Sequence, residues 1–138
     1  MVKSDAKDWA ERFAERYRAG QNEATRQIEL AVIGGDWGAN GYTTVHQADL
    51  LGEVLALRPG MQLLDLGAGR GWPGLYLSAT TGCRAVLSDV PIEGLRTAAA
   101  RARRENLSSR AAAVVAGAGA LPFPPASFDA IVHTDVLC

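Results

Sequence analysis

The fold of this chain is decided by residues 63–74, which read Leu63-Leu64-Asp65-Leu66-Gly67-Ala68-Gly69-Arg70-Gly71-Trp72-Pro73-Gly74. The apolar start shows no alternation, which is typical of a central strand covered on both faces. The alternate glycines Gly67, Gly69 and Gly71 allow a tight turn and a close approach of the backbone to a ligand. We expect Pro73 at the first position of a helix, where its missing N–H costs nothing. The stretch therefore predicts a strand, a glycine turn and a helix N-terminus, which together can hold an anionic group.

The glycine turn has more than one interpretation. A purely structural turn is possible in a chain with 15 glycines, and Gly69–Gly74 spells the dinucleotide fingerprint G-x-G-x-x-G. That fingerprint begins two residues into the turn, and Pro73 removes an amide where a phosphate would be held. A pattern that starts at Asp65 fits better, because the acidic residue then stands at the end of the strand. Here the sequence resembles the class I S-adenosylmethionine-dependent methyltransferases, whose first motif is D/E-x-G-x-G-x-G.

Composition limits the alternatives for function. The chain has 138 residues, one domain or less, and a net charge of −1, which gives no electrostatic reason to expect a nucleic-acid partner. Its polar start lacks the apolar core of a signal peptide, and no apolar run approaches the length of a membrane span. Cys83 and Cys138 have no metal-ligand spacing, so we expect reduced thiols, no metal site and a cytoplasmic location.

The residues before the glycine turn predict helices. Apolar and aromatic residues between 6 and 17 recur at helical spacing, and we assign this stripe to packing rather than to cofactor binding. A second helix should start at Asn22 as N-cap and end near residues 34–35. Residues 36–43 form a glycine-rich loop with two aromatic side chains, which either covers the cofactor as a lid or simply connects two helices. We therefore expect a helical extension with a possible lid over residues 1–57, ahead of a cofactor-binding α/β half-domain over residues 58–138.

Helices and strands alternate after the glycine turn. The pattern predicts a helix to Gly82, strands over 85–87, 111–115 and 128–132, and a longer helix that Pro91 opens. Such alternation predicts an α/β fold with a parallel, Rossmann-like sheet and right-handed crossovers. The resemblance implies the strand order 3-2-1-4 and an incomplete sheet, because the family sheet has seven strands.

Asp89 is the second acidic candidate, 24 residues after Asp65 and at the end of the next strand. Because ligands bind outside the carboxyl ends of parallel strands, both acids should face one crevice. A carboxylate there can accept two hydrogen bonds from a ribose diol. Asp89 could also cap the following helix, and by itself it would fit a nicotinamide enzyme equally well.

Residues 121–132 carry the third match, since they resemble the methyltransferase pattern LPFPDxSFDxVV. Together the three matches cover residues 61–135. The resemblance implies cofactor contacts that we list in chain order: Asp65 near the amino group, Gly67, Ala68, Gly69 and Gly71 against the methionine part, Asp89 on the ribose, Val90 on the adenine face and His133 beside the methionine. Gly117 stands where the family often has an Asp that binds the adenine amino group. Adenine would then rest on the backbone around Gly117 and Ala118.

The sequence thus predicts S-adenosyl-L-methionine-dependent methyl transfer to an unidentified acceptor, which we expect to be a small molecule. Residues 133–137 lack the D/N-P-P-F/Y motif, which disfavours amino methyltransferases that act on bases or glutamine. His133 and Asp135 are the nearby candidates for a general base, but no catalytic residue is assigned. A nicotinamide-dependent dehydrogenase fragment and a non-catalytic cofactor-binding module remain alternatives. The fourth strand should have an open edge, at which the chain self-associates or binds a complementary chain.

Overall fold

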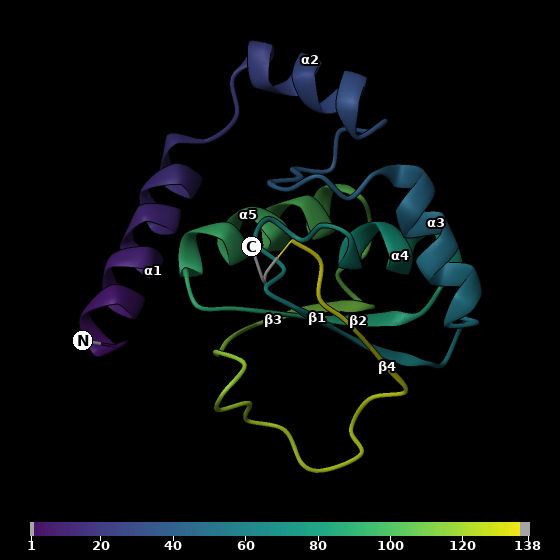
Figure 1. The fold of residues 1–138 in the computed structure, drawn as a ribbon. Helices are drawn as coiled ribbons and strands as arrows, with labels where there is room; N and C mark the ends of the chain where they lie inside the picture. Colours follow the sequence, from purple (N-terminus) through teal and green to yellow (C-terminus); the bar gives the residue numbers. More distant parts are fainter. Residues whose placement is uncertain (1, 136–138) are drawn as a thin grey trace.

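Four parallel strands form one sheet in the computed structural model, which describes residues 2–135 (Figure 1). The strands are β1 (Gln62–Leu66), β2 (Arg84–Asp89), β3 (Ala111–Val115) and β4 (Ala130–Val132). Their order is β3-β2-β1-β4, and every neighbouring pair is parallel. The expected α/β fold and strand order are therefore confirmed.

Two helices cover one face of this sheet. α4 (Gly74–Thr81) follows β1 and α5 (Ile92–Arg104) follows β2, and Figure 1 shows both on the same side. Apolar side chains of β2 and α5 form one buried cluster, which includes Leu87, Leu95 and Ala98. A second cluster joins α4 to β1 and β4 through Leu63, Leu77 and Val132. Burial of these side chains fixes the helices on the sheet and so positions the turns that precede them.

The segment between β3 and β4, which has no helix of its own, lies on the opposite side of the sheet and leaves part of that face exposed (Figure 1). Phe123 and Phe128 of this segment meet edge to face, with ring centroids 5.0 Å apart. Both rings line an apolar groove together with Leu64 of β1 and Ile131 of β4. Leu64 is buried there, so β1 is covered on both faces, as its continuous apolar sequence predicted.

Two predicted element boundaries are wrong. The fourth strand begins at Ala130 rather than residue 128, because Phe128 packs on Phe123 and the Asp129 carboxylate accepts a hydrogen bond from the Gln62 amide at 2.8 Å. Pro73 is the N-cap of α4 rather than its first residue. The helix starts one residue later, with its Gly74 amide bound by a side chain from β1 instead of by a local cap.

Three helices precede the sheet: α1 (Val2–Ala19), α2 (Glu23–Val32) and α3 (Val45–Val54). Asn22 caps α2 as predicted, since its side chain accepts a hydrogen bond from the Thr25 amide at 2.9 Å. α3 begins with a capping box between Thr44 and Gln47. α1 packs against α5, and α3 packs against α4. Within residues 2–135, no helix is long and apolar enough to cross a membrane.

Candidate functional site

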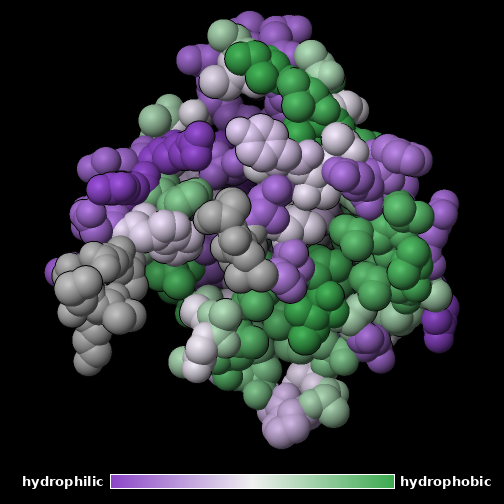
Figure 2. Space-filling view, viewed as in Figure 1, coloured by the Kyte–Doolittle hydropathy of each residue, from purple (hydrophilic) through white to green (hydrophobic). Residues whose placement is uncertain are grey.

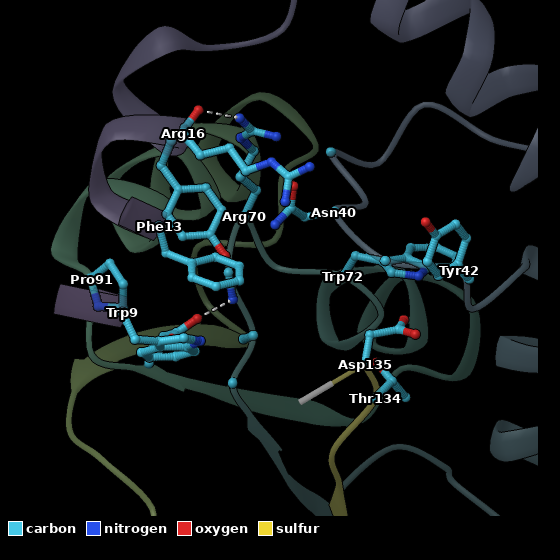
Figure 3. Close-up of a pocket in the computed structure, with 17 residues that line it drawn as sticks. Trp9, Phe13, Arg16, Asn40, Tyr42, Arg70, Trp72, Pro91, Thr134 and Asp135 are labelled. Atoms are coloured by element: carbon cyan, nitrogen blue, oxygen red, sulfur yellow. Dashed lines mark hydrogen bonds between the residues drawn. The ribbon is translucent and has the colours of Figure 1, made fainter. Parts of the chain in front are cut away.

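A cavity of about 270 Å³ opens at the carboxyl ends of β1 and β2. Its floor is the glycine turn after β1, its two sides are α1 and the loop over residues 36–44, and the residues after β4 close one end. Figure 3 shows side chains from all these segments around one space. Ligands of open parallel sheets bind at this edge.

The glycine turn presents backbone to the cavity. Gly67, Ala68 and Gly69 line it, and the amides of Gly67 and Ala68 donate to the Ser88 carbonyl of β2 at 2.7 and 3.1 Å. Gly69 has a φ of +53°, and a Cβ there would lie 2.7 Å from the Tyr17 hydroxyl. The turn therefore requires glycine at 69 for both its conformation and its space. Gly71 points into the core instead, where a Cβ would lie 2.6 Å from a Leu75 methyl carbon.

Asp65 lies beneath the glycine turn and is only 1% exposed. Its Oδ2 accepts a hydrogen bond from the Gly74 amide at 2.8 Å, which satisfies one of the free N–H groups at the start of α4. Burial raises the pKa of this carboxyl to about 8, although the Gly74 N–H favours the charged form. Asp65 does not line the cavity. The structure thus gives it a role in fixing the turn to the helix.

Asp89 lines the cavity and ties β2 to the glycine turn. Its Oδ2 accepts a hydrogen bond from the Gly69 amide at 2.7 Å, and its Oδ1 accepts one from the Val90 amide at the same distance. Burial raises the pKa of Asp89, while these two amides oppose the shift. A carboxylate has about four acceptor positions, so Asp89 can still accept hydrogen bonds from a diol in the cavity.

Six of the expected site residues do not line the cavity: Asp65, Gly71, Val90, Gly117, Ala118 and His133. Val90 is 44% exposed and adjoins Gly117, at which a Cβ would lie 3.4 Å from a Val90 methyl carbon. His133 is exposed, whereas Thr134 and Asp135 line the cavity. Side chains alternate between faces along a strand and its extension. Because the Val132 side chain faces the core, the side chain of the next residue, His133, points away from it.

α1 contributes three aromatic side chains to the cavity wall, a position that the assignment of its stripe to packing did not anticipate. Trp9, Phe13 and Tyr17 stand one turn apart, and all three line the cavity. Ring centroids lie 4.8 Å apart for the first pair and 6.1 Å apart for the second. The i, i+4 spacing was visible in the sequence, but nothing local indicated which surface the stripe faces.

Arg70 of the glycine turn contacts α1 at two residues. Its guanidinium carbon lies 5.2 Å from the centre of the Tyr17 ring, and its Nη2 donates to the Arg16 carbonyl at 3.2 Å. Burial lowers the pKa of Arg70 and raises that of Tyr17 to about 12, the latter also through the charge of Asp89. The same turn that forms the cavity floor therefore carries the residue that holds one wall.

The loop over residues 36–44, predicted either as a lid or as a plain connector, forms one side of the cavity. Gly38, Asn40, Gly41 and Tyr42 line the cavity from this loop. Side chains from outside the loop hydrogen-bond to it, among them those of Arg26, Glu29, Trp72, Arg101 and Asp135.

The most buried of these side chains is that of Glu29 of α2, which is 4% exposed. Its Oε1 accepts hydrogen bonds from the amides of Trp37 and Ala39 at 2.8 and 3.0 Å. Asp135, after β4, accepts from the amide and the hydroxyl of Thr43 at 3.1 and 2.8 Å. These contacts hold the loop from both sides.

Among residues 2–135, no group of three or more His, Cys, Asp or Glu residues is arranged to hold a metal ion.

The comparisons with known proteins agree with this geometry. A family model described as "Methyltransferase domain" matches residues 63–138, more than half of the chain. The chain is 31% identical over 96 residues to 24-methylenesterol C-methyltransferase 2 of Oryza sativa subsp. japonica, a match that covers 70% of this chain and 26% of the relative. It is 38% identical over 81 residues to a ubiquinone/menaquinone biosynthesis C-methyltransferase of Shewanella frigidimarina, which covers 57% and 32% of the two chains.

A solved structure named the [4+2]-cyclase SpnF is similar with a TM-score of 0.59 and 28% identity, over 78% of this chain and 46% of that one. The chain spans about a quarter to a third of the length of the curated relatives it matches.

Proposed function

Because this chain belongs to the family of class I, S-adenosylmethionine-dependent methyltransferases, we propose that it binds S-adenosyl-L-methionine for methyl transfer to a small-molecule acceptor. The chain would supply the cofactor-binding half of the enzyme. The observation that carries this proposal is the juxtaposition of the glycine turn and Asp89, joined by the 2.7 Å hydrogen bond from the Gly69 amide.

The cavity residues fit this cofactor by their chemistry. Asp89 offers free acceptor positions for the ribose hydroxyls, and the glycine turn forms the floor of the cavity with Gly67, Ala68 and Gly69. S-adenosylmethionine would supply a methyl group on a sulfonium, which an acceptor nucleophile can take in line. The chain's own part is then positioning and the exclusion of water by α1 and the loop over 36–44.

Asp135 is the candidate that could take a proton from an acceptor, because it lines the cavity and His133 does not. Such a role would matter only for acceptors that must lose a proton during transfer. No catalytic residue follows from the arrangement alone, and methyl transfer can proceed on positioning.

A small, largely apolar acceptor is our proposal for the substrate class. Its support is the aromatic lining from Trp9, Phe13, Tyr42 and Trp72, together with relatives whose names refer to a sterol and to quinone biosynthesis. We do not propose a nucleic-acid partner, since the net charge is −1. The cytoplasmic location and the division between residues 57 and 58 stay predictions from the sequence.

Two alternatives have different support. A nicotinamide-dependent enzyme is disfavoured by the family match, and Pro73 leaves the G-x-G-x-x-G reading without one amide at the helix start. A cofactor-binding module that does not transfer methyl groups remains a second candidate. The observation that favours it is the structural neighbour named as a [4+2]-cyclase, because that name describes a different reaction on a similar fold.

Calorimetric titration tests the cofactor. S-adenosylhomocysteine should bind and NAD should not, and NAD binding without binding of S-adenosylhomocysteine would contradict the proposal. Methyl transfer from labelled S-adenosylmethionine to a panel of apolar acceptors then separates the enzyme from the binding module. Binding without transfer to any acceptor, in a protein that contains this chain, would favour the module.

A further inference from the structure

We propose that Trp9 of α1 is a stacking wall for the purine base of the nucleoside bound in the cavity. This inference rests on the proposed function and adds to it a binding residue outside the Rossmann-like part of the chain. It starts from the way in which the cavity divides into two ends.

The labelled side chains in Figure 3 form two groups. Trp9, Phe13 and Pro91 lie together at one end, and Tyr42, Trp72 and Asp135 lie at the other. The glycine turn forms the floor common to both ends. A ligand longer than one ring system would therefore extend from one group to the other.

The position of Asp89 decides which part of the ligand lies at which end. Asp89 is the last residue of β2, and Pro91 follows it by two residues. If Asp89 holds the ribose, the base must lie on the Pro91 side, and the rest of the ligand runs over the glycine turn toward Asp135 after β4. The base then reaches the end of the cavity that Trp9 and Phe13 line.

Trp9 lies outside the buried core formed by the described residues. Its side chain is 44% exposed, and the buried apolar clusters contain no residue of α1. The ring contact recorded for Trp9 is with Phe13, one turn further along the same helix. An exposed tryptophan at a cavity mouth presents a large apolar face that a planar ligand can cover.

The sequence also leaves the base with little polar recognition on the opposite side. Gly117 has no side chain where the related family often carries an Asp, and neither Gly117 nor Ala118 lines the cavity. Stacking on an aromatic ring holds any base without reading its edge, and alanine substitution of such a ring weakens base binding by roughly 5-fold or more. Trp9 can supply the attraction that residue 117 does not.

The test measures affinity for S-adenosylhomocysteine and for 5′-methylthioadenosine, which shares the base and ribose but lacks the amino-acid part. Trp9→Ala should weaken both ligands by the same factor, about 5-fold or more. Trp9→Phe should keep most of the affinity, because phenylalanine still stacks. Arg12→Ala is the matched control on the same helix, since Arg12 does not line the cavity and its guanidinium pairs with the exposed Asp8 at 3.1 Å. Its affinities should equal those of the wild type.

Tryptophan fluorescence gives a second readout that does not depend on the alanine variant folding. Of the three tryptophans, Trp9 and Trp72 line opposite ends of the cavity, so quenching by 5′-methylthioadenosine, which lacks the amino-acid part, should be largely lost in Trp9→Phe. If the wild type binds and Trp9→Ala binds both ligands with unchanged affinity, the inference about Trp9 is overturned but the proposed function stands. The same holds if Trp9→Ala loses affinity for S-adenosylhomocysteine only. A wild-type protein that binds neither nucleoside would overturn the proposed function as well.

Discussion

Asp89 is the residue on which cofactor binding should depend most. Its carboxylate both lines the cavity and accepts the Gly69 amide, so its loss removes a ligand contact and loosens the turn. We expect Asp89→Ala to weaken S-adenosylhomocysteine binding by roughly 1.5–3 kcal/mol, the range for hydrogen bonds to a charged group. Calorimetric titration of this variant measures the effect. Glu53→Ala is the control, because Glu53 is an exposed residue of α3 outside the cavity. Equal affinities in a folded Asp89→Ala protein would remove Asp89 from the ribose site.

Asp65 should make stability depend on pH. Its pKa is about 8 in the folded chain against an ordinary value of 3.8, so the folded state holds a proton that the unfolded chain has lost between these values. The free energy of unfolding should therefore fall as the pH rises from about 4 to about 8, and change no further above that range for this group. At pH 5 the stabilising protonated form is still fully populated in the folded state.

Asp65→Asn cannot ionise, so its stability should vary less with pH than that of the wild type, whatever its stability at any one pH. Urea unfolding of both proteins at pH 5, 6.5 and 8 measures the two slopes. Parallel slopes would show that Asp65 is not the titrating group. The burial of this side chain was not predictable, because a carboxylate at the end of a strand can equally turn upward to a ligand or inward to a helix amide.

The glycine turn, by contrast, was predictable residue by residue. Its signals are local: positive φ values need glycine, and an acidic residue before the turn marks the strand end. The surroundings of each glycine could not be predicted. Gly69 faces the cavity beside Tyr17, and Gly71 faces the core beside Leu75.

At the scale of elements, the loop over 36–44 depends on one buried side chain of α2. Glu29→Ala would leave the amides of Trp37 and Ala39 without their acceptor, and a buried polar group without a partner costs roughly 1–3 kcal/mol. We expect faster hydrogen exchange at these two amides and weaker ligand binding. Glu23→Ala on the same helix is the control, because Glu23 is exposed and pairs only with side chains of α2. Unchanged exchange at both amides would show that the loop is held by other contacts.

The helices and strands themselves followed from periodicity and caps, and the errors came from contacts between distant residues. β4 is short because Asp129 binds Gln62, 67 positions earlier in the chain. The aromatic stripe of α1 was recognised, but a helical stripe states only that one face is apolar. Whether that face meets a core or a cavity depends on Gly69, Gly94 and Arg70, with which Tyr17 packs.

At the scale of the whole molecule, the sheet has an open edge at β4. Within the described residues β4 pairs only with β1, its Ile131 side chain is 55% exposed, and the apolar groove beside Phe123 and Phe128 adjoins it. Figure 2 shows an extended area of hydrophobic surface on the face in view. An unpaired, apolar strand edge favours pairing with another chain. We therefore expect the 138-residue chain to self-associate, or to bind a complementary chain, through β4.

Sedimentation at micromolar concentration measures this association, and hydrogen exchange at residues 130–132 locates it. Ile131→Lys should reduce self-association, because a charge on an edge strand opposes pairing. Val115→Lys on β3 is matched to it, since Val115 is 54% exposed and lies on the other edge strand. A monomer whose residues 130–132 exchange freely would show that this edge stays open.

The strand order at this scale was predicted through the resemblance to the class I methyltransferases, while the alternation of strands and helices predicted only a parallel sheet with right-handed crossovers. How the segments before the sheet are placed, with α1 and the loop over residues 36–44 as the two sides of the cavity, was not predicted. Their placement rests on side chains such as Glu29 and Arg101, whose partners are backbone groups of a loop without regular structure.

The attachment of α1 implies a kinetic property of ligand exchange. Three contacts hold the last turns of this helix. Arg70 contacts the Tyr17 ring and the Arg16 carbonyl, and Arg18 pairs with Glu93 at 3.2 Å. A nucleoside beneath Trp9 could thus depart when the first turns swing aside, with the sheet still folded. Loosening the attachment by Glu93→Gln should raise the association and dissociation rate constants together and leave their ratio nearly unchanged, which stopped-flow fluorescence can measure. The residence time of a ligand would then be governed by a helix that precedes the nucleoside-binding fold.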